Sequence, residues 1–160
     1  VGLMMAKILN VKDKNSLKSA IDLGIAMQLT NISRDIIEDS KNNRFYISNN
    51  FGSIKETLKT ADLFYESSFS SIKKIPFSFR FSILVARRVY RKIGQNILNK
   101  KNIENYNNSG KIYVTNIDKI IQTFLSLFDL IGLSLIKSKD HLRYKEHQII
   151  NEEINLDERF

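Results

Sequence analysis

The segment Leu23–Tyr46, which reads LGIAMQLTNISRDIIEDSKNNRFY, restricts the folds open to this chain more than any other stretch. If it is helical, four polar side chains lie three, four and four residues apart and share one face: Gln28, Asn31, Asp35 and Asp39. Apolar residues flank this stripe on both sides, whereas a surface helix separates one apolar face from one charged face. We therefore expect the stripe to face a cavity inside the protein.

The acidic end of this stripe predicts a metal site. Asp35 and Asp39, with Glu38 beside them, repel one another, and the repulsion grows as water is removed. A hard divalent cation between them relieves it, and Mg²⁺ takes one or two carboxylates and completes its shell with water and phosphate oxygens. Arg34 and Arg44 flank the cluster, and guanidinium groups pair well with phosphate. The combination indicates a site for a metal ion and a diphosphate.

The same residues also have an ordinary interpretation. Asp35, Glu38 and Asp39 would then form a solvated helix face, and Arg34 would make an ion pair with Glu38 one turn away. For an isolated D-x-x-E-D pattern on a helix, this interpretation is the favoured one. The surrounding residues shift the balance toward a functional site.

The run Q-L-T-N-I-S-R-D-I-I-E-D, followed by R-F-Y, resembles the second aspartate-rich motif of the phytoene/squalene synthase family, the head-to-head isoprenyl diphosphate synthases. It looks most like the bacterial phytoene synthases. The resemblance implies an all-α fold, an isoprenoid synthase-type helical bundle around a central cavity. Because V-G-L-M-M matches the helix before this motif, we expect residues 1–137 to be the C-terminal part of such a domain, with the N-terminal half missing, and residues 138–160 to be a polar tail.

The resemblance also implies site residues. The residues with implied catalytic roles are Asp35, Asp39, Tyr46 and Tyr106. Those implied to bind the substrate diphosphate are Gln28, Asn31, Arg34 and Arg44. The implied ligands of Mg²⁺, with Mn²⁺ as the alternative ion, are Asp35, Asp39 and Asn31.

Three of these assignments rest on two short elements that depart from the family pattern. Arg44 and Tyr46 match an R-x-Y element, although Asn43 replaces the usual glycine before the arginine. Tyr106 matches an aromatic residue at a fixed distance from an R-x-x-V element, in which Lys111 replaces the arginine. A surface loop position for Tyr106 is an equal alternative.

The implied function is the head-to-head condensation of two prenyl diphosphates, geranylgeranyl diphosphate to phytoene, in carotenoid biosynthesis. Squalene synthases carry F-W-P after the motif arginine, whereas this chain has Phe45-Tyr46-Ile47, so no NADPH is expected. The alternatives are a dehydrosqualene or squalene synthase that uses farnesyl diphosphate, and a non-catalytic relative that acts as a binding or assembly module. Without the other aspartate-rich motif, the chain alone should not turn over.

Composition limits the partners. The chain has a net charge of +8 and no cysteine, but its lysines are scattered, so nucleic acid is not an expected partner. Val1–Asn10 lacks the basic flank and long apolar core of a secretory signal, which favours a cytoplasmic protein. The apolar segment Ile117–Ile136 is expected to be a core helix; the alternative is a face for peripheral membrane contact.

The periodicity predicts five helices in this chain, and Ser16 and Pro76 are expected to mark the start of two of them. Their expected ranges are Val1–Leu9, Leu17–Ser40, Ile54–Lys74, Phe77–Lys100 and Ile117–Ile136.

Overall fold

The structure is a computed structural model that describes residues 2–135 and 144–147. In this part of the chain all regular structure is helical, so the all-α class predicted from the sequence is confirmed. The elements are α1 (Gly2–Ile8), α2 (Lys14–Lys41), α3 (Phe51–Phe69), the 3₁₀-helix η1 (Ser70–Lys74), α4 (Phe77–Leu98), α5 (Ile103–Asn108) and α6 (Asn116–Leu135).

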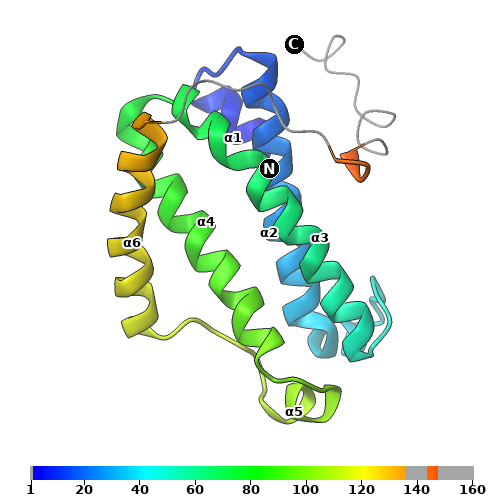
Figure 1. Ribbon diagram of the computed structural model, residues 1–160. Coiled ribbons are helices and arrows are strands. Elements are labelled where there is room, and N and C mark those ends of the chain that lie inside the picture. Colours follow the sequence, from blue (N-terminus) through cyan, green and yellow to red (C-terminus); the bar gives the residue numbers. More distant parts are fainter. Residues whose placement is uncertain (1, 136–143, 148–160) are drawn as a thin grey trace.

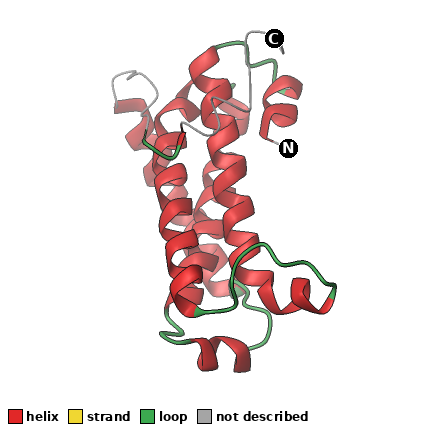
Figure 2. Cartoon of the chain, turned by 90° about the vertical axis from the view of Figure 1, so that its right-hand side faces the viewer, coloured by secondary structure: helices red, strands yellow, loops and turns green. Residues whose placement is uncertain are grey.

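The four long helices run up and down beside one another (Figure 1). α2 and α3 make the most extensive contact, α4 packs against both, and α6 lies on the outer side of α4. The short helices mark the two ends, because α1 packs at the beginning of α2 and α5 lies at the opposite end of the bundle (Figures 1 and 2).

The start of α2 differs from the prediction. Asp13, and not Ser16, is the N-cap, and its Oδ2 accepts hydrogen bonds from the Ser16 backbone N–H at 2.9 Å and from the Ser16 hydroxyl at 2.8 Å. Both residue types cap helices well. Asp13 precedes Ser16 by three positions, a spacing at which an N-cap side chain accepts from a backbone N–H of the first turn. The helix consequently begins at Lys14.

The interface between α2 and α3 is the most extensive in the described part of the bundle. Ala26 on α2 meets Ala61, Phe64 and Tyr65 on α3, and all four are buried. The Tyr65 hydroxyl lies 3.0 Å from the Thr30 hydroxyl, which satisfies both groups in the core. Phe64 and Tyr65 are therefore core residues.

A second core cluster joins α2, α3 and α4 to the connection that follows α4. This connection contains the short helix α5. Tyr106 on α5 is only 1% exposed, so the surface-loop alternative for this residue is wrong. Buried partners from the other helices explain the difference, because Ile36, Ile54 and Ile97 surround it in one cluster.

The expectation of a core helix at Ile117–Ile136 is also wrong for the part that the structure describes. Ser126 and Leu133 on α6 are buried against its neighbours, but most of its large apolar side chains are exposed. The physical reason is that α4 and η1 are the elements that pack against α6 among the described residues. None of the described helices is long and apolar enough to cross a membrane, and peripheral contact through this face stays a prediction.

Most of the predicted tail lies outside the described residues, and the division at residue 137 stays a prediction. One described segment of it, 144–147, contacts the bundle: His147 Nε2 lies 2.9 Å from Asp22 Oδ2, and both side chains are buried.

Candidate functional site

The polar stripe of α2 lies on the side of the helix that α3 leaves uncovered. Asn31, Asp35 and Asp39 are half-buried, and Gln28 is exposed. The described residues therefore do not enclose the stripe, and the predicted internal cavity is not closed in this part of the chain. The reason is geometric, because the buried face of α2 carries Ala26 and its neighbours toward α3.

Asp35 is the centre of the first group of site residues. Arg34 binds it with two hydrogen bonds of 2.9 and 2.8 Å, and Lys111 Nζ lies 3.3 Å from Asp35 and 2.6 Å from Glu38. Burial alone would raise the pKa of Asp35, but the contacts with Arg34 and Lys111 outweigh it and hold this pKa below its ordinary value. Asp35 is thus a carboxylate at neutral pH.

Tyr106 on α5 contacts the backbone of α2 beside this group. Its hydroxyl donates toward two backbone carbonyl oxygens of α2, at 2.9 Å from Ser33 and 3.0 Å from Arg34. Burial raises the pKa of Tyr106 to about 12, so the hydroxyl stays protonated. These contacts fix the turn that carries Arg34 and Asp35, and the catalytic role implied for Tyr106 stays a prediction.

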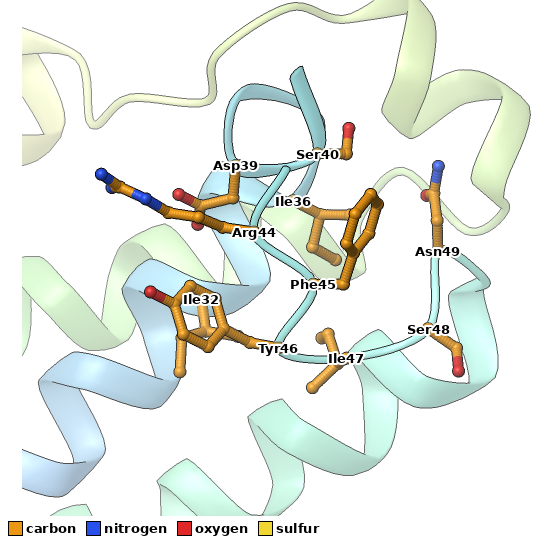
Figure 3. Close-up of a pocket in the computed structure, with 10 residues that line it drawn as sticks. All are labelled: Ile32, Ile36, Asp39, Ser40, Arg44, Phe45, Tyr46, Ile47, Ser48 and Asn49. Carbon is orange, nitrogen blue, oxygen red and sulfur yellow. The ribbon is translucent and has the colours of Figure 1, made fainter. Parts of the chain in front are cut away.

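Asp39, Arg44 and Tyr46 form the second group, around a pocket at the C-terminal end of α2 (Figure 3). The pocket has a volume of about 440 Å³, and its other wall is the loop between α2 and α3. Asp39 and Arg44 point to the same side of it, and the Tyr46 ring lies beside Ile32 (Figure 3). Carboxylate, guanidinium and phenol therefore line one pocket.

The end of α2 explains how Arg44 reaches Asp39. Asn43 has a φ of 56°, a left-handed conformation that asparagine tolerates better than most residues. It turns the chain back so that the Arg44 N–H donates to the Asp39 carbonyl oxygen at 2.8 Å. Asn43, which stands where the family pattern has glycine, thus makes this left-handed turn.

The predicted residues therefore fall into two groups. Asn31, Arg34 and Asp35 share one part of the α2 face, and Asp39 lies with Arg44 and Tyr46 in the pocket. Gln28 lines neither place. Lys111, which was not predicted to be a site residue, belongs to the Asp35 group. It stands where the family's R-x-x-V element has arginine, and this position could have identified it as a candidate.

The donor set fits a Mg²⁺ ion in chemical type. The Oδ1 atom of Asn31 is buried and has no hydrogen-bond partner, and Asn31 stands one turn before Asp35. An unsatisfied amide oxygen beside a carboxylate is the kind of oxygen ligand that Mg²⁺ takes. Among the described residues there is no group of three or more acidic or histidine side chains that could hold a metal. Water and phosphate oxygens would have to supply the other ligands.

A second cavity of about 440 Å³, almost entirely apolar, continues the same face of α2 toward its N-terminus. Most of its other walls come from α1 and the turn after it, η1 and α4, and α3 contributes Ser68. Its α2 wall contains Ala20, Gly24 and Met27, and Asn31 and Asp35 follow at the same helical spacing. Sequence reasoning missed this cavity, although the small residues in that register could have indicated it.

Residues 1–51, which contain α1, α2 and the pocket loop, match the family model described as squalene/phytoene synthase. The chain is also 36% identical over 119 residues to the 15-cis-phytoene synthase of Enterobacter agglomerans. It is 35% identical over 115 residues to that of a Paracoccus species and 36% identical over 115 residues to that of Pantoea ananas. The resemblance to the squalene/phytoene synthase family is confirmed.

These squalene/phytoene synthase matches cover 59–61% of this chain but only 37–40% of the curated relatives. The chain therefore spans well under half the length of these phytoene synthases. No solved structure matches it.

Proposed function

We propose that this chain is the C-terminal part of a phytoene synthase-type prenyltransferase and supplies one half of its active site. The observation that carries the proposal is the single face of α2, on which Asn31 and Asp35 follow directly after the apolar cavity wall at Gly24 and Met27. A prenyl diphosphate has the same order of parts, with a charged head and an apolar tail.

In this proposal Mg²⁺ is held by Asp35, Asp39 and Asn31, and when bound it neutralises charge on the departing diphosphate. Arg34, Arg44 and Lys111 pair with phosphate oxygens. Arg34 and Lys111 are next to Asp35, and Arg44 lines the same pocket as Asp39. Lys111 and Arg34 now pair with Asp35, so substrate binding would redistribute these contacts.

The cavity accommodates the tail and keeps water away from the reacting carbons. At about 1.5 Å of rise per residue, its α2 wall extends from about 12 Å (Met27) to about 28 Å (Ser16) from Asp35. A geranylgeranyl chain of four isoprene units extends about 20 Å and a farnesyl chain about 15 Å, taking carbon–carbon bonds of about 1.5 Å. With the metal ion and the diphosphate between Asp35 and the tail, the longer chain fills more of the length of the cavity than the shorter one does.

This depth supports two geranylgeranyl diphosphates as substrates and phytoene as the product, as the names of the relatives also do. The alternative is farnesyl diphosphate with a dehydrosqualene or squalene product. Tyr46 lines the same pocket as Asp39 and Arg44, and this supports a role for its ring near a diphosphate bound there.

The test uses a fusion of this chain to the part of the Enterobacter agglomerans relative that lies before the matched region. The fusion is incubated with Mg²⁺ and either geranylgeranyl or farnesyl diphosphate, and the hydrocarbon product is identified. We expect phytoene, and loss of product in Asp35→Ala and Asp39→Ala. Asp62→Asn, which changes an exposed carboxylate on α3, is the control and should retain activity.

A C30 hydrocarbon would keep the reaction but change the substrate to farnesyl diphosphate. A folded fusion that makes no product from either diphosphate would contradict the enzyme proposal and favour a non-catalytic relative. Full activity in Asp35→Ala would contradict the role given to α2.

A further inference from the structure

A small cavity on another side of α4, facing α6, is lined by cations and amides. Its volume is about 130 Å³. None of its lining residues is a carboxylate; they are Arg87, Arg88, Arg91, Lys92, Gln95 and Gln122. It shares no residue with the pocket at Arg44 or with the apolar cavity, so it is independent of the proposed active site.

Three of the four cations are neutralised from outside the cavity. Their partners belong to α3 and α6, and the pairs are Arg88 with Asp129 at 2.5 Å, Arg91 with Asp62 at 2.8 Å and Lys92 with Asp118 at 3.6 Å. These pairs hold the cationic side chains around the cavity without filling it.

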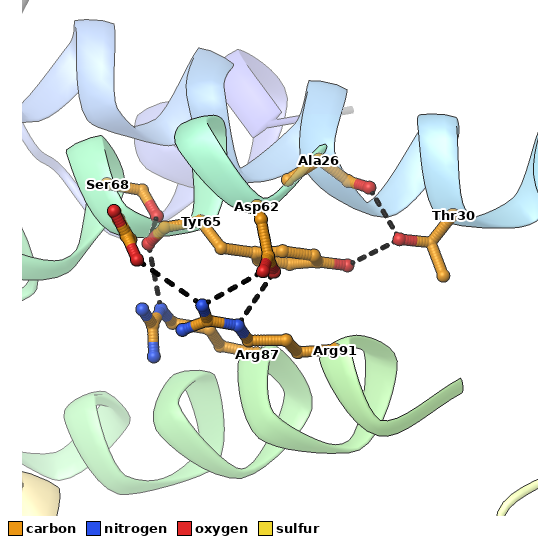
Figure 4. A network of polar contacts seen from close by, with 8 residues as sticks. Ala26, Thr30, Asp62, Tyr65, Ser68, Arg87 and Arg91 are labelled. Atoms are coloured by element: carbon orange, nitrogen blue, oxygen red, sulfur yellow. Dashed lines mark hydrogen bonds and ion pairs between the residues drawn. The ribbon is translucent and has the colours of Figure 1, made fainter. Parts of the chain in front are cut away.

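Arg87 differs from its neighbours. It is only 7% exposed, and among the described residues no carboxylate lies within ion-pair distance of it. Its Nε donates to the Tyr65 carbonyl oxygen at 3.0 Å, and its guanidinium carbon lies 4.8 Å from the centre of the Phe69 ring. Figure 4 shows it beside Arg91, whose guanidinium turns toward Asp62 instead.

A buried cation without a paired anion is costly. Burial and, to a smaller extent, the neighbouring Arg91 lower the pKa of Arg87 to about 10, yet the guanidinium stays charged at neutral pH. The Tyr65 carbonyl and the Phe69 ring offset part of this cost. An anion that entered the cavity from solution would remove most of the rest.

We propose that this cavity binds a phosphate-type oxyanion, with Arg87 as its buried anchor and Gln122 of α6 as a donor from the opposite wall. The volume equals that of about four water molecules, which suits one phosphate group and excludes a long chain. The anion would join α4 to α6, because its ligands come from both helices.

Binding of inorganic phosphate to the 160-residue chain is measured by isothermal titration calorimetry at constant ionic strength, with EDTA present. We expect saturable binding that Arg87→Gln weakens about tenfold or more, because a charge-assisted pair is lost. The matched control is Arg80→Gln on the same helix. Arg80 also donates from Nε to a backbone carbonyl, that of Ile75, and also lies over a phenylalanine ring, but it is outside the cavity.

A second variant covers the case in which Arg87→Gln does not fold. Gln122→Glu introduces a carboxylate into the cavity wall and should take the place of the anion. We expect it to raise the melting temperature without phosphate and to abolish phosphate binding.

Each outcome decides the proposal. Phenyl phosphate that binds as tightly as inorganic phosphate identifies the phosphate group of a larger molecule as the ligand, and weaker binding of it identifies the free ion. No saturable binding, or equal weakening by Arg87→Gln and Arg80→Gln, overturns the proposal. It is overturned equally if Gln122→Glu leaves phosphate binding unchanged.

Discussion

At the scale of single residues, Tyr106 has the clearest structural role in the candidate site. It reaches across from α5 and donates to two carbonyl oxygens in the middle of α2, at Ser33 and Arg34. Carbonyl oxygens inside a helix already accept from the helix backbone, so the added donor fixes the position of this turn. The side chains of Arg34 and Asp35 start from that turn.

We expect Tyr106→Phe to lower the free energy of unfolding by about 1–2 kcal/mol, because a buried donor is removed and the ring is kept. Urea unfolding followed by circular dichroism measures this change. Tyr113→Phe is the control, because Tyr113 is 66% exposed and should lose almost nothing. Equal losses in the two variants would show that the Tyr106 hydroxyl does not stabilise α2.

Sequence reasoning reached the polar stripe but not its partners. The helical spacing of Asn31, Asp35 and Asp39 follows from local periodicity, which a sequence displays directly. The contact of Lys111 with Glu38 joins residues 73 positions apart, and no local pattern encodes such a pairing. The burial of Tyr106 stayed undecided in the sequence for the same reason, because most of its neighbours come from other helices.

At the scale of elements, α2 depends on its N-cap. Asp13 accepts from Ser16 and also pairs with Lys74 of η1 at 2.9 Å, so it joins the start of α2 to the end of η1. Burial would raise the pKa of Asp13, but the hydrogen bonds from Lys74 and Ser16 outweigh it and leave this pKa below its ordinary value.

A carboxylate with a lowered pKa stabilises the folded state above its unfolded pKa and loses this effect as the pH falls through its folded pKa. Asp13→Asn should therefore cost about 0.5 kcal/mol at neutral pH, a small value because the side chain is partly solvated. The difference should shrink as the pH falls below the ordinary aspartate pKa of 3.8 and vanish once the pH lies below the lowered pKa of folded Asp13. Thermal unfolding across this pH range measures it, with Glu56→Gln as the exposed control on α3; a difference that grew on acidification would contradict the assignment.

α6 is held to the bundle by few buried side chains, and Leu133 is one of them at 2% exposed. It packs with Ile72 of η1 and Leu84 of α4. We expect Leu133→Ala to cost about 2–4 kcal/mol through lost burial and a cavity. Leu135→Ala, at a position 81% exposed, should cost little in the same urea titration. Similar effects of the two substitutions would mean that α6 is not docked as described.

The elements themselves were largely predictable, since four of the five expected helices needed only shifts at their ends. The corrections concern the residue that caps α2 and the burial of α6. Asp13 and Ser16 are both good caps, and the structure alone selects one. α6 has the composition of a core helix, but the periodicity of a sequence does not show how many faces of the helix pack against other helices.

At the scale of the whole molecule, the candidate site is a face and not a closed chamber. Asn31 and Asp35 share this face with the apolar cavity, and Asp39 lies at its edge in the pocket with Arg44. The sequence motif identified the polar part of this face, which contains Asn31, Asp35 and Asp39. The apolar part needs walls from α1, η1 and α4, which meet only in the folded bundle.

The central claim is that one face of α2 binds both the diphosphate and the prenyl tail. It is tested most directly by backbone amide NMR spectra of the chain, titrated with Mg²⁺ and pyrophosphate and, separately, with Mg²⁺ and geranylgeranyl diphosphate. We predict that both ligands shift the signals of Asn31 and Asp35. Only the prenyl ligand should shift those of Gly24 and Met27, and that of Ala86, which lines the apolar cavity from α4. Tail-dependent shifts confined to α6, or identical shifts with the two ligands, would contradict the account.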